Sequence, residues 1–361
     1  MNREDFPILN NSELIYLDNG ATTLKPQCVI DKITEYYTKY SANAHRGDYD
    51  ISMKVDMEYE NARDIVKDFI NAKSRKEIIF TSGTTESLNM IANGFFKQYL
   101  EQGDEIIITD SEHASNVIPW FRLAKTNGVT VKKCPLDENH YVTLNNLKKV
   151  ITPQTKLISI AMITNVIGDL RPVKEICKFA HEHNIFVVID GAQSVPHIKT
   201  DVQDLDCDFL AFSGHKLCGP TGIGVLYGKY ELLNSLEPQN LGGGMNESFD
   251  NVDEVALKEL PTRLEAGTPN IEGVMGMDAA ISYLMKIGME NIEAHERELK
   301  DLLISEMKKL DNVILYNEKT DSGIVSFNVR DIFAQDAAGY LASRGIAVRS
   351  GIEERMSGRR T

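Results

Sequence analysis

One lysine stands where an apolar segment gives way to a short polar turn. Residues 207–213 are mostly apolar, and Gly214, His215 and Lys216 follow them. An ammonium group at the end of a buried strand is poorly solvated and tends to lose its proton. A neutral lysine amine is a nucleophile that forms Schiff bases with carbonyl compounds, and pyridoxal phosphate is the commonest case in proteins. The sequence therefore predicts that Lys216 anchors a cofactor covalently.

A second apolar segment supplies a carboxylate in the equivalent position. Residues 185–189 are all apolar, Asp190 follows them, and Gln193 lies three residues further on. Such a continuous run is typical of a strand in a parallel sheet that is buried on both faces. The carboxyl ends of these strands open onto one edge, where ligands of open α/β folds bind. We therefore expect Asp190 and Lys216 to face one site, with Asp190 as the acidic partner of a pyridinium nitrogen.

An anion site is predicted earlier in the chain. Residues 77–80 have the pattern of a strand, residues 81–86 form a turn rich in Gly, Ser and Thr, and a helical pattern begins after them. Hydroxyl groups, backbone N–H groups and the helix dipole together suit a phosphate. Taken alone, the same residues are typical of a helix cap with an acidic first turn. Their position ahead of Asp190 and Lys216 favours the phosphate site.

These segments resemble the class V aminotransferase family, and most of all its cysteine desulfurases, which supply sulfur for iron–sulfur clusters. The resemblance extends from about residue 15 to residue 351 and rests on stretches that occur in the family's order. The matching stretches are residues 16–23, 43–47, 82–89, 112–116, 164–168, 190–194, 213–216, 265–270 and 348–351.

The resemblance implies a fold and an activity. The implied fold is α/β, that of a fold-type I pyridoxal-phosphate enzyme, with a mainly parallel seven-stranded sheet flanked by helices and a smaller α+β domain. Residues 16–265 would form the large cofactor-binding domain, and residues 1–15 and 271–361 the small domain. The implied activity is transfer of sulfur from L-cysteine, which leaves L-alanine, and the implied assembly is a homodimer with a possible sulfur-acceptor protein.

The resemblance also implies roles for individual residues. Lys216 would hold the cofactor and move the α-proton of the amino acid, and Asp190 would keep the ring nitrogen protonated. Gln193 would bond the phenolic oxygen of the ring, while His113 would stack on its face. The other implied cofactor-binding residues are Thr84, Thr85, Asn165, Ser213, His215 and, from a second subunit, Thr268.

The implied substrate site gathers polar residues from several stretches. Arg349 would bind the carboxylate through a bidentate fork that lysine could not reproduce. The residues implied to bind substrate are Asn19, His45, Arg46, Asn165 and Arg349, and those implied in catalysis are Lys216, His113 and Arg349. No metal ligand is implied.

Each of these residues also has a simpler interpretation. His113 alone is more typical of a surface or helix-capping histidine, and Gln193 of a hydrogen bonder at a helix start. Thr268, beside Pro269, is an ordinary turn residue. Arg349, after a short apolar segment, is typical of a surface cation. Only the order and spacing of the whole set favour the functional interpretation.

The sequence departs from the family at the nucleophilic thiol. Cysteine desulfurases usually continue the Arg-Ser-Gly stretch with any residue, then His and Cys, whereas this chain has Ile352, Glu353 and Glu354. A carboxylate cannot form a persulfide. Three classes of function therefore stay open: a desulfurase-like enzyme, another pyridoxal-phosphate reaction such as β-elimination, transamination or selenocysteine cleavage, and a cofactor-binding protein without turnover.

None of the five cysteines is predicted to replace that thiol. Cys28, Cys134 and Cys177 lie in or beside apolar stretches, and Cys207 begins the segment before Lys216. Cys218 lies two residues beyond Lys216, where packing is the expected role. No CxxC pair indicates a metal site or a disulfide framework.

Residues 352–361 form a basic tail that does not match the family. Members of the family usually continue further, so the small domain is expected to be incomplete at its C-terminus and to expose apolar surface. A truncated or frameshifted product, a relative with different chemistry and a chain cut for another purpose all remain open as explanations.

Composition limits the partners. The 361 residues carry a net charge of −14 and no basic block, which argues against nucleic acid and anionic membranes. The N-terminus lacks the apolar core of a signal peptide, and no apolar run could span a bilayer. Unpaired cysteines suit a reducing cytoplasm, so we expect a cytoplasmic enzyme.

Alternating strand and helix patterns from about residue 76 to residue 230 predict the parallel sheet. Glycines at 242–244 and the polar stretch that follows predict a flexible connection up to Asp253. Helix-rich sequence follows after residue 271, with short strands near residues 313–315 and 324–328.

Overall fold

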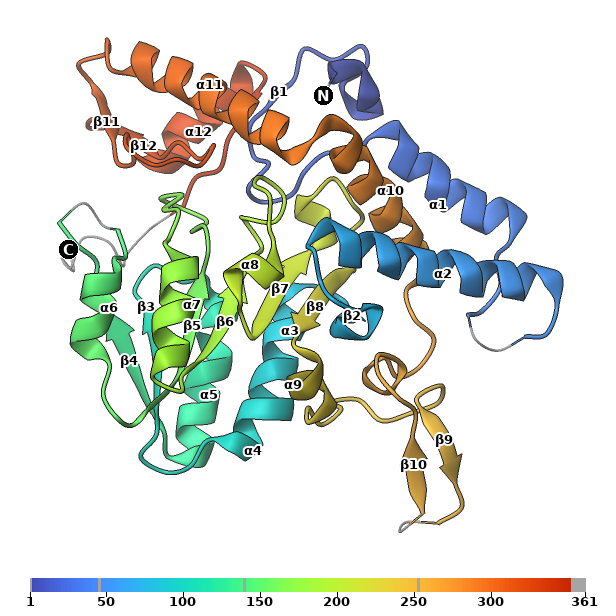
Figure 1. The fold of residues 1–361 in the computed structure, drawn as a ribbon. Helices are drawn as coiled ribbons and strands as arrows, with labels where there is room; N and C mark the ends of the chain where they lie inside the picture. The colour runs from blue at the N-terminus through green and yellow to red at the C-terminus, as the bar shows by residue number, and fades with distance from the viewer. Residues whose placement is uncertain (1, 45–46, 139–140, 252–253, 352–361) are drawn as a thin grey trace.

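The computed structural model describes residues 2–44, 47–138, 141–251 and 254–351. A seven-stranded sheet forms its centre, with helices on both faces (Figure 1). The strands run in the order β2 (Ile78–Thr81), β8 (Gly224–Gly228), β7 (Phe209–Ser213), β6 (Phe186–Asp190), β5 (Thr155–Ala161), β3 (Glu105–Thr109) and β4 (Thr130–Cys134). Strands β7, β6, β5, β3 and β4 are parallel to their neighbours in that series, whereas β8 is antiparallel to β2 and β7. The predicted α/β class and mainly parallel sheet are confirmed.

The apolar runs form strands because both faces of the sheet are covered. On β7, Leu210 and Phe212 point into one apolar core, and Phe209 and Ala211 point into the other. On β3, Ile107 joins the first core while Ile106 and Ile108 join the second. This alternation explains why the sequence of these strands is continuously apolar rather than half polar.

Helices close the two cores. The first core receives side chains from α1 (Gln27–Lys39), α2 (Asp50–Phe69), α6 (Leu144–Val150), α7 (Val173–Glu182), α8 (Val202–Leu205), α10 (Ile271–Ile287) and α11 (Met289–Met307). The second receives them from α3 (Thr84–Met90), the π-helical segment η4 (Ile91–Phe96), α5 (Ile118–Asn127) and α9 (Tyr230–Asn234). The short helix α4 (Lys97–Tyr99) continues η4.

A buried ion pair ties the segment after the sheet to its first strand. The Arg63 guanidinium donates to both carboxylate oxygens of Glu265, at 2.7 and 2.9 Å, and to the carbonyl of Ile78. The backbone N–H of Phe80 donates to the same carboxylate at 2.7 Å. Because Arg63 is 1% exposed, this bidentate pair fixes the start of the segment that leads to Thr268.

The N-terminal and C-terminal elements meet at one end of the molecule (Figure 1). Strand β1 (Ile15–Tyr16) pairs in parallel with β13 (Ile346–Ala347), and β11 (Val313–Leu315) pairs antiparallel with β12 (Phe327–Val329). Helix α12 (Ala334–Ser343) precedes β13. Six 3₁₀ turns complete the described chain: η1 (Arg3–Asp5), η2 (Pro7–Leu9), η3 (Arg75–Glu77), η5 (Ala114–Asn116), η6 (Gly214–Lys216) and η7 (Thr262–Leu264).

The predicted flexible connection before Asp253 is wrong in part. Strand β9 (Asn246–Phe249) lies within it and pairs antiparallel with β10 (Val255–Leu257), in a hairpin that projects from the body of the molecule (Figure 1). Its side chains are largely exposed, so its sequence lacks the apolar alternation that marks a half-buried strand.

The division into a large and a small domain stays a prediction. Helix α10, which the prediction assigns to the small domain, contributes Val274, Met277 and Ile281 to the same core as β2 and β7. Among the described residues, no helix is both long and apolar enough to cross a membrane.

Candidate active site

Two neighbouring strands end in the predicted lysine and aspartate. Strands β6 and β7 are parallel, with Asp190 beside Ala211, and the turn η6 carries Lys216 just past the end of β7. All five residues of β7 are buried, as are the last four of β6. The expectation that both side chains lie at one edge of the sheet is confirmed, because parallel neighbours bring their carboxyl ends together.

Burial is the main influence on both groups. It lowers the pKa of the Lys216 amine, and the positive charge of Arg349 lowers it further, although Asp190 opposes the shift. Burial raises the pKa of Asp190 to about 6, against the hydrogen bond from the Ala192 backbone N–H. A lysine with a lowered pKa has more of the neutral, nucleophilic amine at neutral pH than an exposed lysine.

The hydroxyl groups of the predicted phosphate site lie at the start of α3. The Ser213 hydroxyl, at the end of β7, accepts the Thr84 N–H at 2.8 Å and lies 2.7 Å from the Thr84 hydroxyl. The Thr85 hydroxyl lies 2.8 Å from that of Ser115. Gly83, at φ +152°, precedes the helix and packs against β8 so closely that a side chain on Gly224 would collide with it. These contacts hold hydroxyl groups and a helix start beside the Lys216 turn.

His113 caps a turn and also stands near the lysine. Its Nδ1 accepts the backbone N–H of Ser115 at 3.2 Å, so the capping interpretation is confirmed. Partial burial of the imidazole ring lowers the pKa of His113, although the residue as a whole is exposed. The positive charges of Lys216 and Arg349 lower this pKa further. Since Nδ1 is an acceptor, the neutral ring carries its proton on Nε2. A neutral ring of fixed orientation suits a stacking partner.

Unpaired polar atoms beside Asp190 provide a test of whether the site fits a cofactor. The Nε2 of Gln193 donates to the carbonyl of Gly20 at 2.8 Å, but its Oε1 is buried without a hydrogen-bond partner among the described residues. The hydroxyl of Ser194 is likewise buried without a hydrogen-bond partner among the described residues. Since buried polar groups are normally paired, these atoms indicate a site that a polar group completes. Gln193 lies in a turn and not at a helix start.

A buried charge network underlies the site, and the sequence analysis did not identify it. The Arg171 guanidinium pairs with Glu112 and with Asp169, and it donates to the hydroxyls of Thr109 and Ser111 at 2.8 and 2.7 Å. Glu112 also accepts the side-chain N–H of Asn116 and the backbone N–H of Ala161. This network holds the residue before His113 in place. Two of its members, Asp169 and Arg171, follow Gly168 closely in the sequence, but Glu112 lies 59 residues before Arg171.

Arg349 follows the pairing of β1 with β13. The backbone N–H of Leu17 donates to Ala347 at 2.9 Å, which brings the segment containing Asn19 beside the segment containing Arg349. Arg349 is exposed, and within the described ranges no carboxylate pairs with it. Its charge lowers the pKa of both Lys216 and His113, so it lies within electrostatic reach of them. Asn19 itself donates to the carbonyl of Tyr16, at 3.4 Å.

Asn165 begins a turn that the C-terminal region grips. Asn317 donates to the carbonyl of Ile167 at 2.7 Å, and the hydroxyls of Ser326 and Thr320 donate to the carbonyls of Val166 and Gly168. The turn that carries Asn165 therefore contacts the loop between β11 and β12. These contacts place Asn165 between the sheet and the C-terminal region.

The remaining predicted site residues are Thr268, which is exposed, His215, which lies beside Lys216, and four residues outside the described ranges. Thr268 is exposed, and its hydroxyl accepts a hydrogen bond from Asn43 at 3.4 Å, so its role across a subunit boundary stays a prediction. His215 lies in η6 beside Lys216, with a pKa lowered by burial and by nearby lysines. His45, Arg46, Glu353 and Glu354 lie outside the described residues.

The five thiols have little thiolate character. Burial raises the pKa of Cys218 to about 11, and it also raises those of Cys28, Cys134, Cys177 and Cys207. Four of the five are buried, and all five are free. The predicted packing role is confirmed for the four buried cysteines and is wrong for Cys28, which is exposed. None of the five has the lowered pKa that a nucleophilic cysteine needs.

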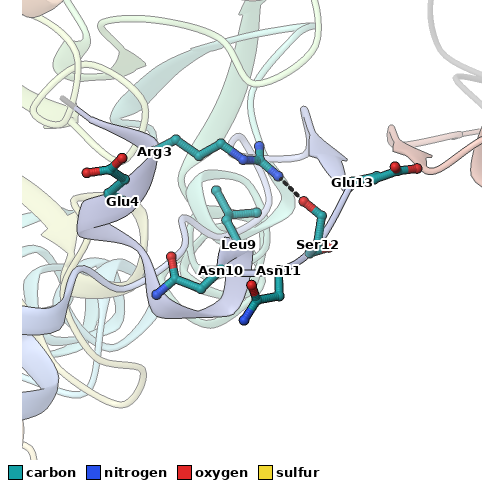
Figure 2. Close-up of a pocket in the computed structure, with 7 residues that line it drawn as sticks. All are labelled: Arg3, Glu4, Leu9, Asn10, Asn11, Ser12 and Glu13. Atoms are coloured by element: carbon teal, nitrogen blue, oxygen red, sulfur yellow. Dashed lines mark hydrogen bonds between the residues drawn. The ribbon is translucent and has the colours of Figure 1, made fainter.

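A surface hollow elsewhere has no part in this chemistry. It encloses about 610 Å³ and is lined by Arg3, Glu4 and residues 9–13, and Arg3 donates across it to the Ser12 carbonyl at 2.7 Å (Figure 2). None of the predicted site residues lines it.

The sequence and the fold both match known proteins. The profile of the aminotransferase class-V family matches residues 15–355. A probable cysteine desulfurase of Halalkalibacterium halodurans is 44% identical over 350 residues, which cover 96% of this chain and 86% of that protein.

Two solved structures share the fold. The apo structure of a cysteine desulfurase from Thermococcus onnurineus NA1 is 40% identical with a TM-score of 0.92, and the match covers 97% of this chain and 86% of that one. The cysteine desulfurase CsdA from Escherichia coli, in an S-sulfonic acid form, is 38% identical with a TM-score of 0.90 and covers 97% and 87%.

Proposed function

The chain belongs to the class V aminotransferase family, and from that premise we propose that it is a pyridoxal-phosphate-dependent cysteine desulfurase. In this reaction a thiol takes the sulfur of L-cysteine as a persulfide, and L-alanine remains. The observation that carries the proposal is the position of Asp190 and Lys216 at the ends of adjacent buried strands, with the pKa of the lysine lowered.

The residues around Lys216 fit pyridoxal phosphate. When bound, this cofactor supplies an aldehyde for a lysine and a ring that accepts the electrons released from the substrate. The hydroxyls of Thr84, Thr85 and Ser213 and the start of α3 would hold its phosphate, together with His215. Asp190 would pair with the ring nitrogen, and that positive partner would lower the pKa of its carboxyl.

Lys216 would act twice. Its neutral amine would hold the cofactor, and with a substrate bound the same amine would take the proton from the substrate α-carbon. Because Asp190 lies on the neighbouring strand, one rigid sheet edge would position both the Lys216 amine and the Asp190 carboxylate.

His113 and Gln193 would orient the ring. The proton on Nε2 and the bond from Ser115 to Nδ1 keep the His113 ring in one position for stacking. The Oε1 of Gln193 can only accept a hydrogen bond, so in this orientation the amide would accept one from a protonated phenolic oxygen. A deprotonated oxygen would require the amide to rotate and release Gly20.

The substrate carboxylate would lie between the two ends of the chain. Arg349 supplies a bidentate donor pair, and Asn165 and Asn19 supply amide groups from the two segments that flank it. His45 and Arg46 complete the proposed substrate set. An arginine without a carboxylate partner among the described residues is available for a substrate carboxylate.

The sulfur would pass to a thiol other than the five in this sequence. All five have raised pKa values, and the family's thiol position is occupied by Glu354. A sulfur-acceptor protein in iron–sulfur cluster assembly is the partner we propose. We also propose a cytoplasmic homodimer, in which Thr268 of one subunit reaches the phosphate of the other.

A second candidate is a pyridoxal-phosphate lyase that needs no nucleophilic thiol on the enzyme. The same residue, Glu354, favours it. Selenocysteine is the substrate we would expect, because a selenol leaves more readily than a thiol. The residues around Lys216 would act in the same way in both reactions.

One experiment tests the proposal and separates the candidates. The purified chain is loaded with pyridoxal phosphate, reduced with borohydride and digested, and we expect the cofactor on the peptide that contains Lys216. Loaded protein is then given L-cysteine with dithiothreitol as the thiol acceptor, and alanine and sulfide should form in equal amounts. Selenide and alanine from L-selenocysteine, without sulfide from L-cysteine, would favour the second candidate. A chain that forms no adduct at Lys216 would contradict both.

A further inference from the structure

A segment near the N-terminus forms hydrogen bonds with the backbone on both sides of Lys216. The carbonyl of His215 accepts hydrogen bonds from the backbone N–H of Thr23 at 2.9 Å and from the hydroxyls of Thr22 and Thr23 at 3.1 and 3.0 Å. The Lys25 amine donates to the same oxygen at 3.1 Å. A carbonyl oxygen has only two lone pairs, so these four donors share it, and together they restrain its position from several sides. We call residues 22–25 the strap.

The Thr23 hydroxyl connects the two sides of the lysine. It donates to the carbonyl of His215, the residue before Lys216, and it accepts the backbone N–H of Cys218 at 2.8 Å, two residues after Lys216. A hydroxyl provides one donor and two acceptor sites, so one oxygen can make both bonds. No other side chain among the described residues bonds to both of these backbone groups.

The backbone that Thr23 holds is strained. Cys218 has φ +65°, in the left-handed region that residues other than glycine rarely adopt. A strained backbone persists only where surrounding contacts determine it, and such positions cluster at functional sites. The bond between the Thr23 hydroxyl and the Cys218 N–H is a contact of this kind.

Lys25 joins the strap to the Lys216 turn through its side-chain amine. Its amine donates to the carbonyl of Thr23 at 2.6 Å as well as to that of His215. Burial lowers the pKa of Lys25 to about 8. A neutral amine still donates hydrogen bonds, so these contacts do not depend on its charge.

The strap also connects the two halves of the proposed site. Tyr16, in β1, donates its hydroxyl to the carbonyl of Thr22 at 2.8 Å, and β1 pairs with β13 just before Arg349. Residues 16–25 therefore extend from the strand beside β13, which precedes Arg349, to the turn that carries Lys216. Besides these backbone groups, the Thr23 hydroxyl lies within hydrogen-bonding reach of the Cys218 thiol, and it touches no group proposed to react.

We propose that Thr23, with Lys25, is a positioning residue that sets the backbone of the Lys216 turn and hence the place and basicity of the Lys216 amine. The structural part of this inference is independent of the reaction, and its catalytic part rests on the proposed function. The side chain of Thr23 therefore acts on the proton-transfer step through the Lys216 turn and leaves substrate binding to Arg349.

The test compares Thr23→Val, which removes the hydroxyl and keeps the shape, with Thr23→Ser, which keeps the hydroxyl. Thr34→Val serves as the matched control, because Thr34 donates to a carbonyl on the exposed side of α1, far from Lys216 in sequence. Hydrogen exchange of the cofactor-free proteins is measured by mass spectrometry over residues 214–218. We expect Thr23→Val to speed exchange there, and Thr23→Ser and Thr34→Val to match the wild type.

The second measurement uses the loaded protein. In Thr23→Val the pH midpoint of the visible cofactor absorbance should move, and kcat should fall about tenfold with an unchanged KM for L-cysteine, since a misplaced group slows the step it catalyses. Thr23→Ser should restore both values. Lys25→Met and Lys25→Arg repeat the comparison at a second position if Thr23→Val does not fold.

The outcomes distinguish the two proposals. Exchange and absorbance midpoint in Thr23→Val equal to those of the wild type would overturn the positioning role, as would an equal change in Thr34→Val. A wild-type chain that binds no cofactor would overturn the proposed function, while the exchange measurement would still decide the role of the strap.

Discussion

Every residue of β7 and the last four residues of β6 are buried, whereas no residue of β11, β12 or α12 is buried. The first group carries Asp190 and leads into Lys216, and we call it the cofactor half of the site. The second group leads into Arg349, and we call residues 313–351 the arginine half. The two halves would bind opposite ends of one amino-acid adduct, yet they are held by different forces.

The cofactor half is positioned by packing. Its strands lie between two apolar cores, and the first turn of α3 is bonded to Ser213 at the end of β7. The arginine half is positioned by a few hydrogen bonds, in the pairing of β1 with β13 and in the grip of Asn317 on the turn after Asn165. Rigidity is therefore concentrated around the lysine proposed to transfer the proton, whereas the arginine proposed to bind the substrate carboxylate lies in a more exposed part of the chain.

The largest expected effect comes from the lysine. Lys216→Ala should lower kcat by roughly 10³-fold, because the variant loses both the anchoring amine and the base. The unfolding midpoint should stay unchanged, since the packing of β7 does not depend on the amine. Lys174→Ala, which removes an exposed lysine paired with Asp204, is the control. Turnover that survives Lys216→Ala would break the comparison, because the cofactor half would then not contain the base.

A pair of core substitutions tests the difference in packing. Leu210→Ala, on β7, should lower the free energy of unfolding by about 3 kcal/mol, because a fully buried leucine leaves a cavity. Ile314→Ala, on β11, should cost less than about 1 kcal/mol, because Ile314 is 38% exposed. Urea denaturation of both variants gives the two values. Equal losses would mean that the two halves are packed alike.

A third prediction concerns the free energy that burial of the Asp190 carboxylate costs the folded protein. Its pKa in the folded chain is about 6, above its usual value of 3.8, so the folded state binds more protons than the unfolded state between these values. The free energy of unfolding of the cofactor-free protein should therefore fall as pH rises through this window. Asp190→Asn cannot ionise, and at about pH 7 it should be more stable than the wild type by about 3 kcal/mol.

The comparison is made on cofactor-free proteins by urea denaturation at about pH 4 and about pH 7, with the difference present only at the higher pH. Asp204→Asn, at an exposed aspartate, is the control and should show no such gain. A destabilised Asp190→Asn at the higher pH would show that the ionised carboxylate is already satisfied without the cofactor.

The smallest expected effect is in the arginine half. Arg349→Lys should raise the KM for L-cysteine about tenfold, because an ammonium replaces a bidentate fork with a single point of contact. The cofactor absorbance and the unfolding midpoint should not change. Arg344→Lys, which lies at the end of α12 and is also exposed, is the control. A changed absorbance in Arg349→Lys would mean that the two halves are less separate than their packing indicates.

The cofactor half could be predicted from sequence because its signals are local. Continuous apolar runs predict buried parallel strands, and the polar residue that ends each run then falls at one edge of the sheet. Asp190, Ser213 and Lys216 are placed in this way, and the structure confirms their common edge. The turn before α3 follows from its Gly, Ser and Thr residues for the same reason.

The remaining features depend on contacts that composition does not encode. The hydrogen bond from the Cys218 N–H to the Thr23 hydroxyl joins residues that are far apart in sequence, and threonines in a turn predict only local hydrogen bonds. The ion pair of Arg171 with Glu112 could not be predicted, because the sequence does not show which loops meet beneath the sheet edge. The hairpin of β9 and β10 was missed because both its faces are exposed, so no apolar alternation marked it.

The pairing of β1 with β13 has a consequence for the order in which the chain folds. It joins residues near the two ends of the sequence, while all seven strands of the central sheet lie between residues 78 and 228. Contacts across such long separations form late, and domains generally fold as synthesis proceeds from the N-terminus. The sheet edge with Lys216 can thus be complete while Arg349 is still being synthesised. We expect the nascent chain to be able to capture its cofactor before it can hold a substrate.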